Sequence, residues 1–206
     1  MLANASKQRL SSSERRAAII KAAVELFSSR GFRGATTREI AAAVGVTEPV
    51  LYQHFETKQE LYTAIVDDML SQMEARGNAR IAKCGEINDD RVFFQILGET
   101  VLEWFTDQTA GCRLLILSEL EGHELAEIWN ERATKKIRDF IEGYLARRAA
   151  EGVLNVPEPE MAARAFLGMV AHYGLCTTIL RSWTPRKPSR EAVADFVEIF
   201  LNGIKK

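Results

Sequence analysis

The chain has 206 residues, of which 47% are hydrophobic and 27% are charged, and this balance is typical of a soluble globular protein and excludes a disordered one. The net charge is only −1, but residues 1–58 carry nine basic and five acidic side chains, a net charge of +4, which leaves −5 for the rest. A basic N-terminal part favours contact with a polyanion such as nucleic acid. Ordinary scatter of surface charge is the alternative.

The cysteines and the apolar stretches indicate the compartment. Cys84, Cys112 and Cys176 are far apart and include no C-x-x-C pair, which argues against a disulfide framework and a metal site and favours a reducing cytoplasm. The longest uncharged stretch, residues 165–180, is shorter than the roughly 20 residues of a membrane-spanning helix. Charged residues also interrupt every candidate signal core in the first thirty positions. We therefore expect a cytoplasmic protein that does not span a membrane.

Three helix starts are marked near the N-terminus. A Ser or Thr is followed three residues later by Glu at Ser11, Thr36 and Thr57, and this capping-box pattern predicts a helix at each position. The first of these helices is expected to end at Gly31 and the second at Gly45. Apolar residues recur at helical spacing along nearly the whole chain, and no strand-like alternation or internal repeat is visible.

One further short helix is predicted between Gly45 and Thr57. Thr47 is a suitable N-cap, and Pro49 lies in the first turn, where its missing N–H costs nothing. Leu51 and Phe55 are four residues apart and should pack inward. The remaining side chains then face mostly outward: Thr47, Glu48, Val50, Gln53 and His54. A short helix that presents polar side chains after a glycine turn predicts a helix-turn-helix unit.

The rest of the chain also has helical periodicity. We expect a helix capped by Asn88, then Gly111 as a separator before a short apolar run that ends near Gly122. A long helix should end at Gly152, a break is expected at residues 157–159, and Ser189 should open the last helix. About nine helices result, in an all-α fold. We predict a helix-turn-helix DNA-binding domain over residues 1–60 and a helical ligand-binding and dimerisation domain over residues 61–206.

Residues 36–58 read TTREIAAAVGVTEPVLYQHFETK. This segment strongly resembles the TetR family of bacterial regulators, whose hallmark is a Thr-rich start to helix 2, a glycine turn, and a Leu-Tyr-x-His-Phe recognition helix followed by Lys. The resemblance is dense over residues 13–65 and rests on helix count and length beyond that. It implies a homodimer whose two recognition helices enter major grooves of a roughly palindromic double-stranded DNA operator.

The matching positions imply roles for individual residues. Phosphate contacts are expected from Thr37, Tyr52, His54 and Lys58, and base contacts from Thr47, Glu48, Val50 and Gln53. Lys58 lies in the first turn of a helix, where free backbone N–H groups already favour a phosphate. Glu48 departs from the basic or small residue of many relatives. It either accepts a hydrogen bond from cytosine and so specifies sequence, or simply favours the helix dipole.

The resemblance further implies release from DNA by a small-molecule effector, whose identity and polarity stay open. Aromatic bulk mixed with a few polar groups on adjacent helices predicts a pocket. Its proposed lining contains several of the following residues, with plain core as the alternative for each: Phe94, Trp104, Trp129, Phe166, Met169, His172, Tyr173 and Cys176. A satisfied core histidine is the favoured interpretation of His172.

The last helix carries an apolar stripe that must be buried against something. By resemblance to the family, this stripe forms the dimer interface, and burial within its own subunit is the alternative. The residues are Val193, Phe196, Val197, Phe200, Leu201 and Ile204.

Other function classes are less well supported. The segment beginning His123-Glu124 resembles the zincin motif H-E-x-x-H but has Glu127 in place of the second histidine, and no phosphate-binding loop or nucleophile elbow is present. We expect no catalytic residue, no metal and no cofactor. An architectural DNA-binding protein without a ligand switch remains an alternative, as does a ligand-binding protein with a vestigial head. Repression, rather than activation, follows only from the habit of the family.

Overall fold

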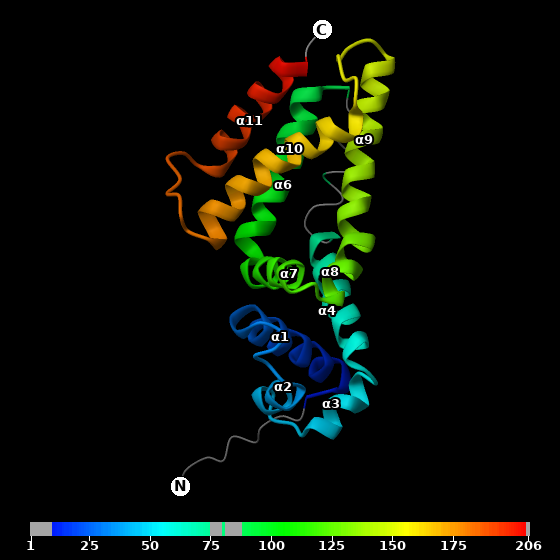
Figure 1. Ribbon diagram of the computed structural model, residues 1–206, viewed down its shortest axis with the longest axis vertical. Helices are drawn as coiled ribbons and strands as arrows, with labels where there is room; N and C mark the ends of the chain where they lie inside the picture. The colour runs from blue at the N-terminus through cyan, green and yellow to red at the C-terminus, as the bar shows by residue number, and fades with distance from the viewer. Residues whose placement is uncertain (1–9, 75–79, 81–87, 205–206) are drawn as a thin grey trace.

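The computed structural model describes residues 10–74, 80 and 88–204, and the regular elements in these ranges are helices. Figure 1 shows an elongated molecule with the first helices of the chain at one end and the end of the last helix at the other. The N-terminal end, here called the head, consists of α1 (Ser12–Arg30), α2 (Thr37–Ala43) and α3 (Glu48–His54). Helix α4 (Lys58–Met73) leads from the head into the remaining helices, here called the body.

All three N-terminal helix starts have the expected N-cap residue, and two of the three have the complete capping box. Ser11 and Thr36 each form a complete capping box, with the side chain accepting from the backbone N–H three residues on and the Glu carboxylate accepting in return. At α4 the box is incomplete. Thr57 accepts from the N–H of Glu60, but the Glu60 carboxylate accepts from the N–H of Glu56, at 2.7 Å.

The body consists of helices that pack along and across one another (Figure 1). Helix α8 runs without a break through a π-helical turn into α9, and a second π-helical turn extends α10. Counted this way, the described residues form nine helices, as the sequence predicted. The body elements are α6 (Asp90–Asp107), α7 (Thr109–Glu121), α8 (Glu124–Trp129), the π-helical turn Asn130–Thr134, α9 (Lys135–Ala150), α10 (Pro159–Gly174), the π-helical turn Leu175–Ile179 and α11 (Ser189–Ile204).

Two boundary predictions in the body were wrong. The cap of α6 is Asp89, whose carboxylate accepts from the N–H of Val92 at 3.1 Å, because Asn88 lies one residue too early and accepts from Arg147 instead. Gly111 does not separate two helices but lies inside α7. A β-carbon at this position would come within 2.8 Å of the Met69 methyl group of α4, so glycine leaves room for the end of that side chain.

The buried apolar side chains form two clusters. The first joins the head to α4 and to the inner faces of α7 and α8, and the second fills the space between α6, α9, α10 and α11. Helix α4 contributes Leu61, Ile65 and Met69 to the first cluster together with Leu114 and Leu125 of the body. The core of the head therefore extends past residue 60, where we placed the domain boundary.

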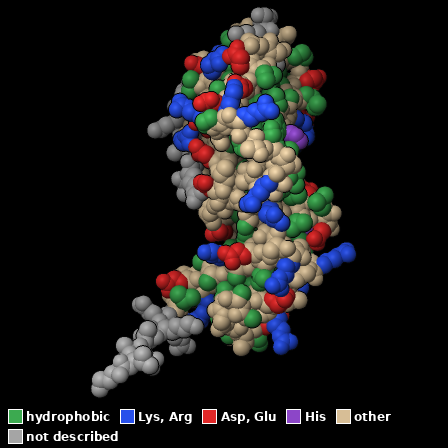
Figure 2. All heavy atoms as spheres, turned by 90° about the vertical axis from the view of Figure 1, so that its left-hand side faces the viewer, with side chains coloured by type: hydrophobic (Ala, Val, Ile, Leu, Met, Phe, Trp, Pro, Cys, Tyr) green, Lys and Arg blue, Asp and Glu red, His purple; other side chains and the backbone are tan. Residues whose placement is uncertain are grey.

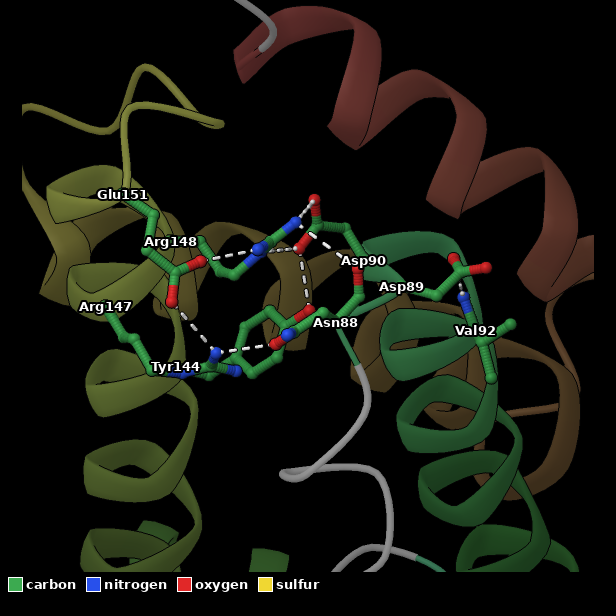
Figure 3. A network of polar contacts seen from close by, with 8 residues as sticks. All are labelled: Asn88, Asp89, Asp90, Val92, Tyr144, Arg147, Arg148 and Glu151. Atoms are coloured by element: carbon green, nitrogen blue, oxygen red, sulfur yellow. Dashed lines mark hydrogen bonds and ion pairs between the residues drawn. The ribbon is translucent and has the colours of Figure 1, made fainter.

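A network of hydrogen bonds and ion pairs joins the start of α6 to the end of α9, at the end of the body far from the head (Figure 3). Asp90, at the start of α6, accepts hydrogen bonds from Arg148 Nε at 2.7 Å and from the Tyr144 hydroxyl at 2.7 Å, both on α9. The Arg148 guanidinium also donates to Glu151 at 2.5 Å. The side chains of Arg148 and Asp90 are only 9% and 13% exposed, so this is a buried ion pair that fixes α6 against α9.

Among the described helices, none is both long and apolar enough to cross a bilayer. Cys112 is buried in α7 and Cys176 is half-buried after α10, and the two are not bonded to each other. Cys84 lies outside the described residues.

Candidate nucleic-acid interface and effector cavity

The recognition helix predicted from the sequence is α3, and it is held by its apolar side. Leu51 and Phe55 are fully buried, as their spacing predicted, and the Arg16 guanidinium of α1 lies 4.6 Å from the centre of the Phe55 ring. The turn before α3 requires Gly45, whose φ of 73° lies in the left-handed region. Because α3 packs against the head through Leu51 and Phe55, the opposite face of the helix stays exposed to solvent.

The predicted base-contacting residues lie on or beside this open face. Thr47 and Gln53 are exposed, and Val50 is half-buried. Thr47 occupies the N-cap position, but its side chain makes no capping hydrogen bond, so its hydroxyl is available to a ligand. An exposed amide on a helix of this size is suited to a bidentate contact with an adenine edge in a major groove.

Glu48 and Thr37 are brought together, which the sequence did not predict. The Thr37 hydroxyl of α2 donates a hydrogen bond to the Glu48 carboxylate at the start of α3. Thr37 is buried and Glu48 is half-buried. The pair therefore links the start of α2 to the start of α3. The Thr37 hydroxyl must leave this bond to donate to a phosphate, whereas the Glu48 carboxylate keeps further lone pairs that can accept from a base.

The predicted phosphate-contacting residues surround the same face. Tyr52 and Lys58 are exposed, and His54 is half-buried at the end of α3. Lys58 is the first residue of α4, so its ammonium group and the free N–H groups of the first turn can bind the same anion. Figure 2 shows the molecule from one side, with basic and acidic side chains interspersed. The basic residues of the head therefore do not form a continuous positive surface on this side.

A cavity of about 150 Å³ lies within the body, between the end of α4, the second half of α6 and the beginning of α9. Its apolar walls are Leu70, Met73, Trp104, Ala133 and Ile137. Polar and charged side chains complete the lining: Gln72, Glu74, Thr100, Glu103, Asp107, Gln108, Arg132 and Lys136. Apolar walls with a few convergent polar groups are typical of small-molecule sites, and at about 150 Å³ this partly open cavity is smaller than the roughly 300–1,000 Å³ of most such sites.

Of the pocket residues proposed from the sequence, only Trp104 lines this cavity. Trp129 is buried behind it, with its ring stacked on that of Trp104 at 5.4 Å. Phe94 and Phe166 are core residues instead, because their rings pack 4.7 Å apart inside the second apolar cluster.

The remaining proposed pocket residues also lie away from the cavity. Met169 and Tyr173 pack against the second cluster or belong to it. His172 is exposed on α10 and is not a core histidine, and its Nε2 lies 3.6 Å from the Cys176 sulfur.

Sequence reasoning missed the contribution of α4 to the cavity. A partial signal was present, since Thr100, Trp104 and Gln108 are spaced four residues apart and place two polar groups on the same side as an aromatic ring. No local pattern indicates that Leu70 and Met73 face that side of α6, because the contact joins segments about thirty residues apart.

The apolar stripe of α11 packs inside its own subunit. Val193 and Val197 have no exposed surface, Phe200 and Leu201 are buried, and Phe196 contacts Tyr173 ring to ring at 5.6 Å. Val193, Val197, Phe200 and Leu201 therefore offer little or no surface to a partner, which corrects our expectation for these four, whereas Phe196 is half-buried. The side chain of Ile204 lies outside the described part of the chain.

The comparisons with known proteins agree with this geometry. Residues 19–65 match the family profile described as bacterial regulatory proteins of the tetR family, and residues 95–203 match that of the AefR-like transcriptional repressor, C-terminal domain. The second match alone covers more than half of the chain. The chain belongs to the TetR family. It is therefore a DNA-binding transcriptional regulator and not an enzyme.

Relatives of this TetR-family protein differ in how much of the chain they match. The transcriptional activator FasR of Mycolicibacterium smegmatis is 28% identical over 158 residues, which cover 72% of this chain and 71% of FasR. The regulator TtgR of Pseudomonas putida is 27% identical over 191 residues, covering 88% and 86%. The class C tetracycline repressor of Escherichia coli is 43% identical over 56 residues, covering only 27% and 26%.

Solved structures share the fold of this TetR-family protein over nearly its whole length. AibR, in complex with isovaleryl coenzyme A and operator DNA, superposes with a TM-score of 0.70 at 24% identity, covering 91% of this chain and 98% of AibR. KstR2 of Mycobacterium tuberculosis superposes with a TM-score of 0.67 at 22% identity, covering 98% and 100%.

Proposed function

We propose that the protein is a repressor that binds a palindromic operator as a homodimer and leaves it when a small molecule enters the cavity. One observation carries this proposal: α4 belongs to both sites. Its first residue, Lys58, lies at the DNA-contacting face, and Leu70 and Met73 near its other end form walls of the cavity. A 16-residue helix spans about 24 Å and moves as one body. A ligand that prefers one position of the far end therefore shifts the near end as well.

Repression is supported by the C-terminal match, whose description names a repressor. Activation is the second candidate, because FasR is described as an activator. Transcription in vitro from a promoter that carries the selected operator separates the two. Addition of the protein lowers transcript yield if it represses and raises it if it activates.

Dimerisation is proposed through the outer faces of α10 and α11. Met161 and Ile199 are 62% and 63% exposed there, and Gly168 lies on the outer side of α10 with open space where a β-carbon would be. Met161 and Gly168 are seven residues apart and so lie on the same face of α10, which is open to a second helix. A second copy of the chain is the occupant expected in this family.

The dimer proposal has a matched test. Gly168→Leu adds bulk to the proposed interface, whereas Gly143→Leu adds the same bulk to an equally open helical position on α9. In sedimentation equilibrium we expect Gly168→Leu to shift the protein towards monomer and Gly143→Leu to leave the dimer intact. Equal behaviour of the two variants contradicts this interface.

The DNA-binding proposal is tested by selecting duplexes from a random pool and sequencing the bound fraction at two salt concentrations. We expect a palindrome to be enriched and the affinity to fall steeply with salt, because phosphate contacts release counterions. Enrichment of no sequence, with only salt-sensitive binding, favours the architectural alternative.

The effector proposal is tested on the selected complex. A panel of metabolites is screened by fluorescence anisotropy for release of the labelled operator, and isovaleryl coenzyme A is included because AibR was solved with it. Ile137→Trp narrows the cavity and should abolish the response to any active compound. Leu120→Trp, at a surface position of α7, is the control and should retain it. A response that survives Ile137→Trp excludes this cavity as the site.

A further inference from the structure

The imidazole ring of His123, in the body, packs against two aromatic rings, those of Phe32 and Tyr62. The His123 ring, between α7 and α8, stacks on the Phe32 ring with centroids 3.6 Å apart and planes 14° from parallel. The Tyr62 ring of α4 meets it edge-on at 4.5 Å. Phe32 in turn stacks on Phe27 of α1 at 5.0 Å. One side chain of the body is thereby inserted into an aromatic cluster of the head.

The position of His123 is fixed from its own side as well. Its Nδ1 accepts a hydrogen bond from the backbone N–H of Leu125 at 3.2 Å, which makes His123 the N-cap of α8. The ring proton is then on Nε2 in the neutral form. Burial keeps the pKa of His123 below its usual value, against the opposing effect of Glu124 and Glu121, and this favours the neutral ring at pH 7.

The other end of α8 forms part of the surroundings of the cavity. Trp129, its last residue, stacks on Trp104 of the cavity wall at 5.4 Å. The π-helical turn that follows contributes Ala133 and Arg132 to the cavity lining. Arg132 also pairs with Asp67 of α4 at 2.5 Å. A π-helical turn within a helix is uncommon and often marks a functional position.

We propose that α8 couples the cavity to the head, with His123 as the residue that positions the head through its contact with Phe32 and Tyr62. This inference rests on the proposed function, because it assumes an effector in the cavity and DNA at α3. Helix α8 has six residues and is about 9 Å long, so it is a short connection between the aromatic rings that His123 contacts at one end and Trp104 of the cavity wall, which Trp129 contacts at the other. It acts beside α4, which it contacts through the Tyr62 ring and through the Arg132–Asp67 pair.

Coupling between two sites is reciprocal, so DNA bound at the head must be sensed at the cavity. This allows a test without knowledge of the effector. The three tryptophans, Trp104, Trp129 and Trp183, are replaced by 5-fluorotryptophan, and the ¹⁹F resonances are assigned with single Trp→Phe variants. Trp183 is 50% exposed in the loop between α10 and α11 and serves as the internal control.

The DNA added is the duplex enriched in the selection from the random pool described above. If that selection enriches no sequence, a mixed-sequence duplex is used at low salt. We expect the duplex to shift the resonances of Trp104 and Trp129 and to leave that of Trp183 in place. His123→Asn keeps an N-cap acceptor but removes the ring, and should abolish both shifts although DNA still binds. His123→Phe keeps a stacking ring and should retain them. Phe32→Leu removes the stack from the side of the head and should repeat the loss.

The outcomes separate the inference from the proposed function. If the wild-type protein binds the duplex and neither Trp104 nor Trp129 responds, the coupling role of α8 is refuted while DNA binding stands. Full shifts in His123→Asn and Phe32→Leu refute the role of the His123 contact. If no duplex binds at any salt concentration, the proposed function and this inference fall together.

Discussion

The buried ion pair between Asp90 and Arg148 offers the sharpest test of how the body is held together. Asp90→Asn removes the charge but keeps the size of the side chain. In the wild type this carboxylate accepts three hydrogen bonds, two from Arg148 at 2.7 and 3.1 Å and one from Tyr144 at 2.7 Å (Figure 3). The replacement leaves the guanidinium buried without its main partner.

The expected loss is about 3 kcal/mol in the free energy of unfolding. Removing one partner of a buried ion pair costs about 3–5 kcal/mol because a charge is stranded. The lower end applies here, since Arg148 keeps its hydrogen bonds to Glu151 at 2.5 Å and to the Asn88 carbonyl at 3.4 Å. For a chain of this length, such a loss lowers the melting temperature by roughly 6–12 °C.

The matched control is Glu160→Gln. Glu160 also lies in the first turn of a helix and pairs with an arginine, Arg164, at 2.8 Å, but both side chains are about half exposed. Exposed pairs contribute about 0–1 kcal/mol, so this variant should unfold almost like the wild type. Urea denaturation followed by circular dichroism measures both. A loss below about 1 kcal/mol in Asp90→Asn, or equal losses in the two variants, refutes the reasoning.

The same pair predicts a pH dependence. Burial by itself raises the pKa of Asp90, but the hydrogen bonds from Arg148 and Tyr144 outweigh it and hold the pKa below its usual value. The contribution of the pair is therefore complete above the unfolded-state pKa of about 4 and is lost as the pH falls through the lower folded-state pKa. The stability difference between wild type and Asp90→Asn should shrink over that acidic range and stay constant near neutrality.

Four further outcomes are expected. Lys58→Ala should weaken operator binding evenly across sequences and reduce the salt slope by about one, whereas Gln53→Ala should relax the preference at one base pair, as competition titrations with single-base variants will show. Leu51→Ala should destabilise the head by about 3 kcal/mol in urea denaturation, because it opens a cavity under α3. Burial raises the pKa of Cys112 to about 12, so at pH 8, in a variant without the third cysteine, it should resist a thiol reagent that modifies Cys176.

The sequence alone determined the head. Its helices begin and end at signals that act within a few residues, such as the capping boxes at Ser11 and Thr36 and the turn at Gly45. The inward face of α3 follows from the spacing of Leu51 and Phe55. Local hydrogen bonding and helical periodicity are sufficient for such features, and the family resemblance covers the same segment.

The tertiary structure decided where the body is hollow and where it is solid. Phe94 and Trp104 are both aromatic residues of α6, yet the first is core and the second lines the cavity, because α10 and α11 cover one and the end of α4 faces the other. The hydrogen bond of Thr37 to Glu48 and the contact of His123 with Phe32 likewise join side chains from different helices. Helical periodicity in the sequence predicts only which face of a helix is buried. Which helix buries it, and whether the two surfaces fill the space between them, depends on packing between segments far apart in the chain.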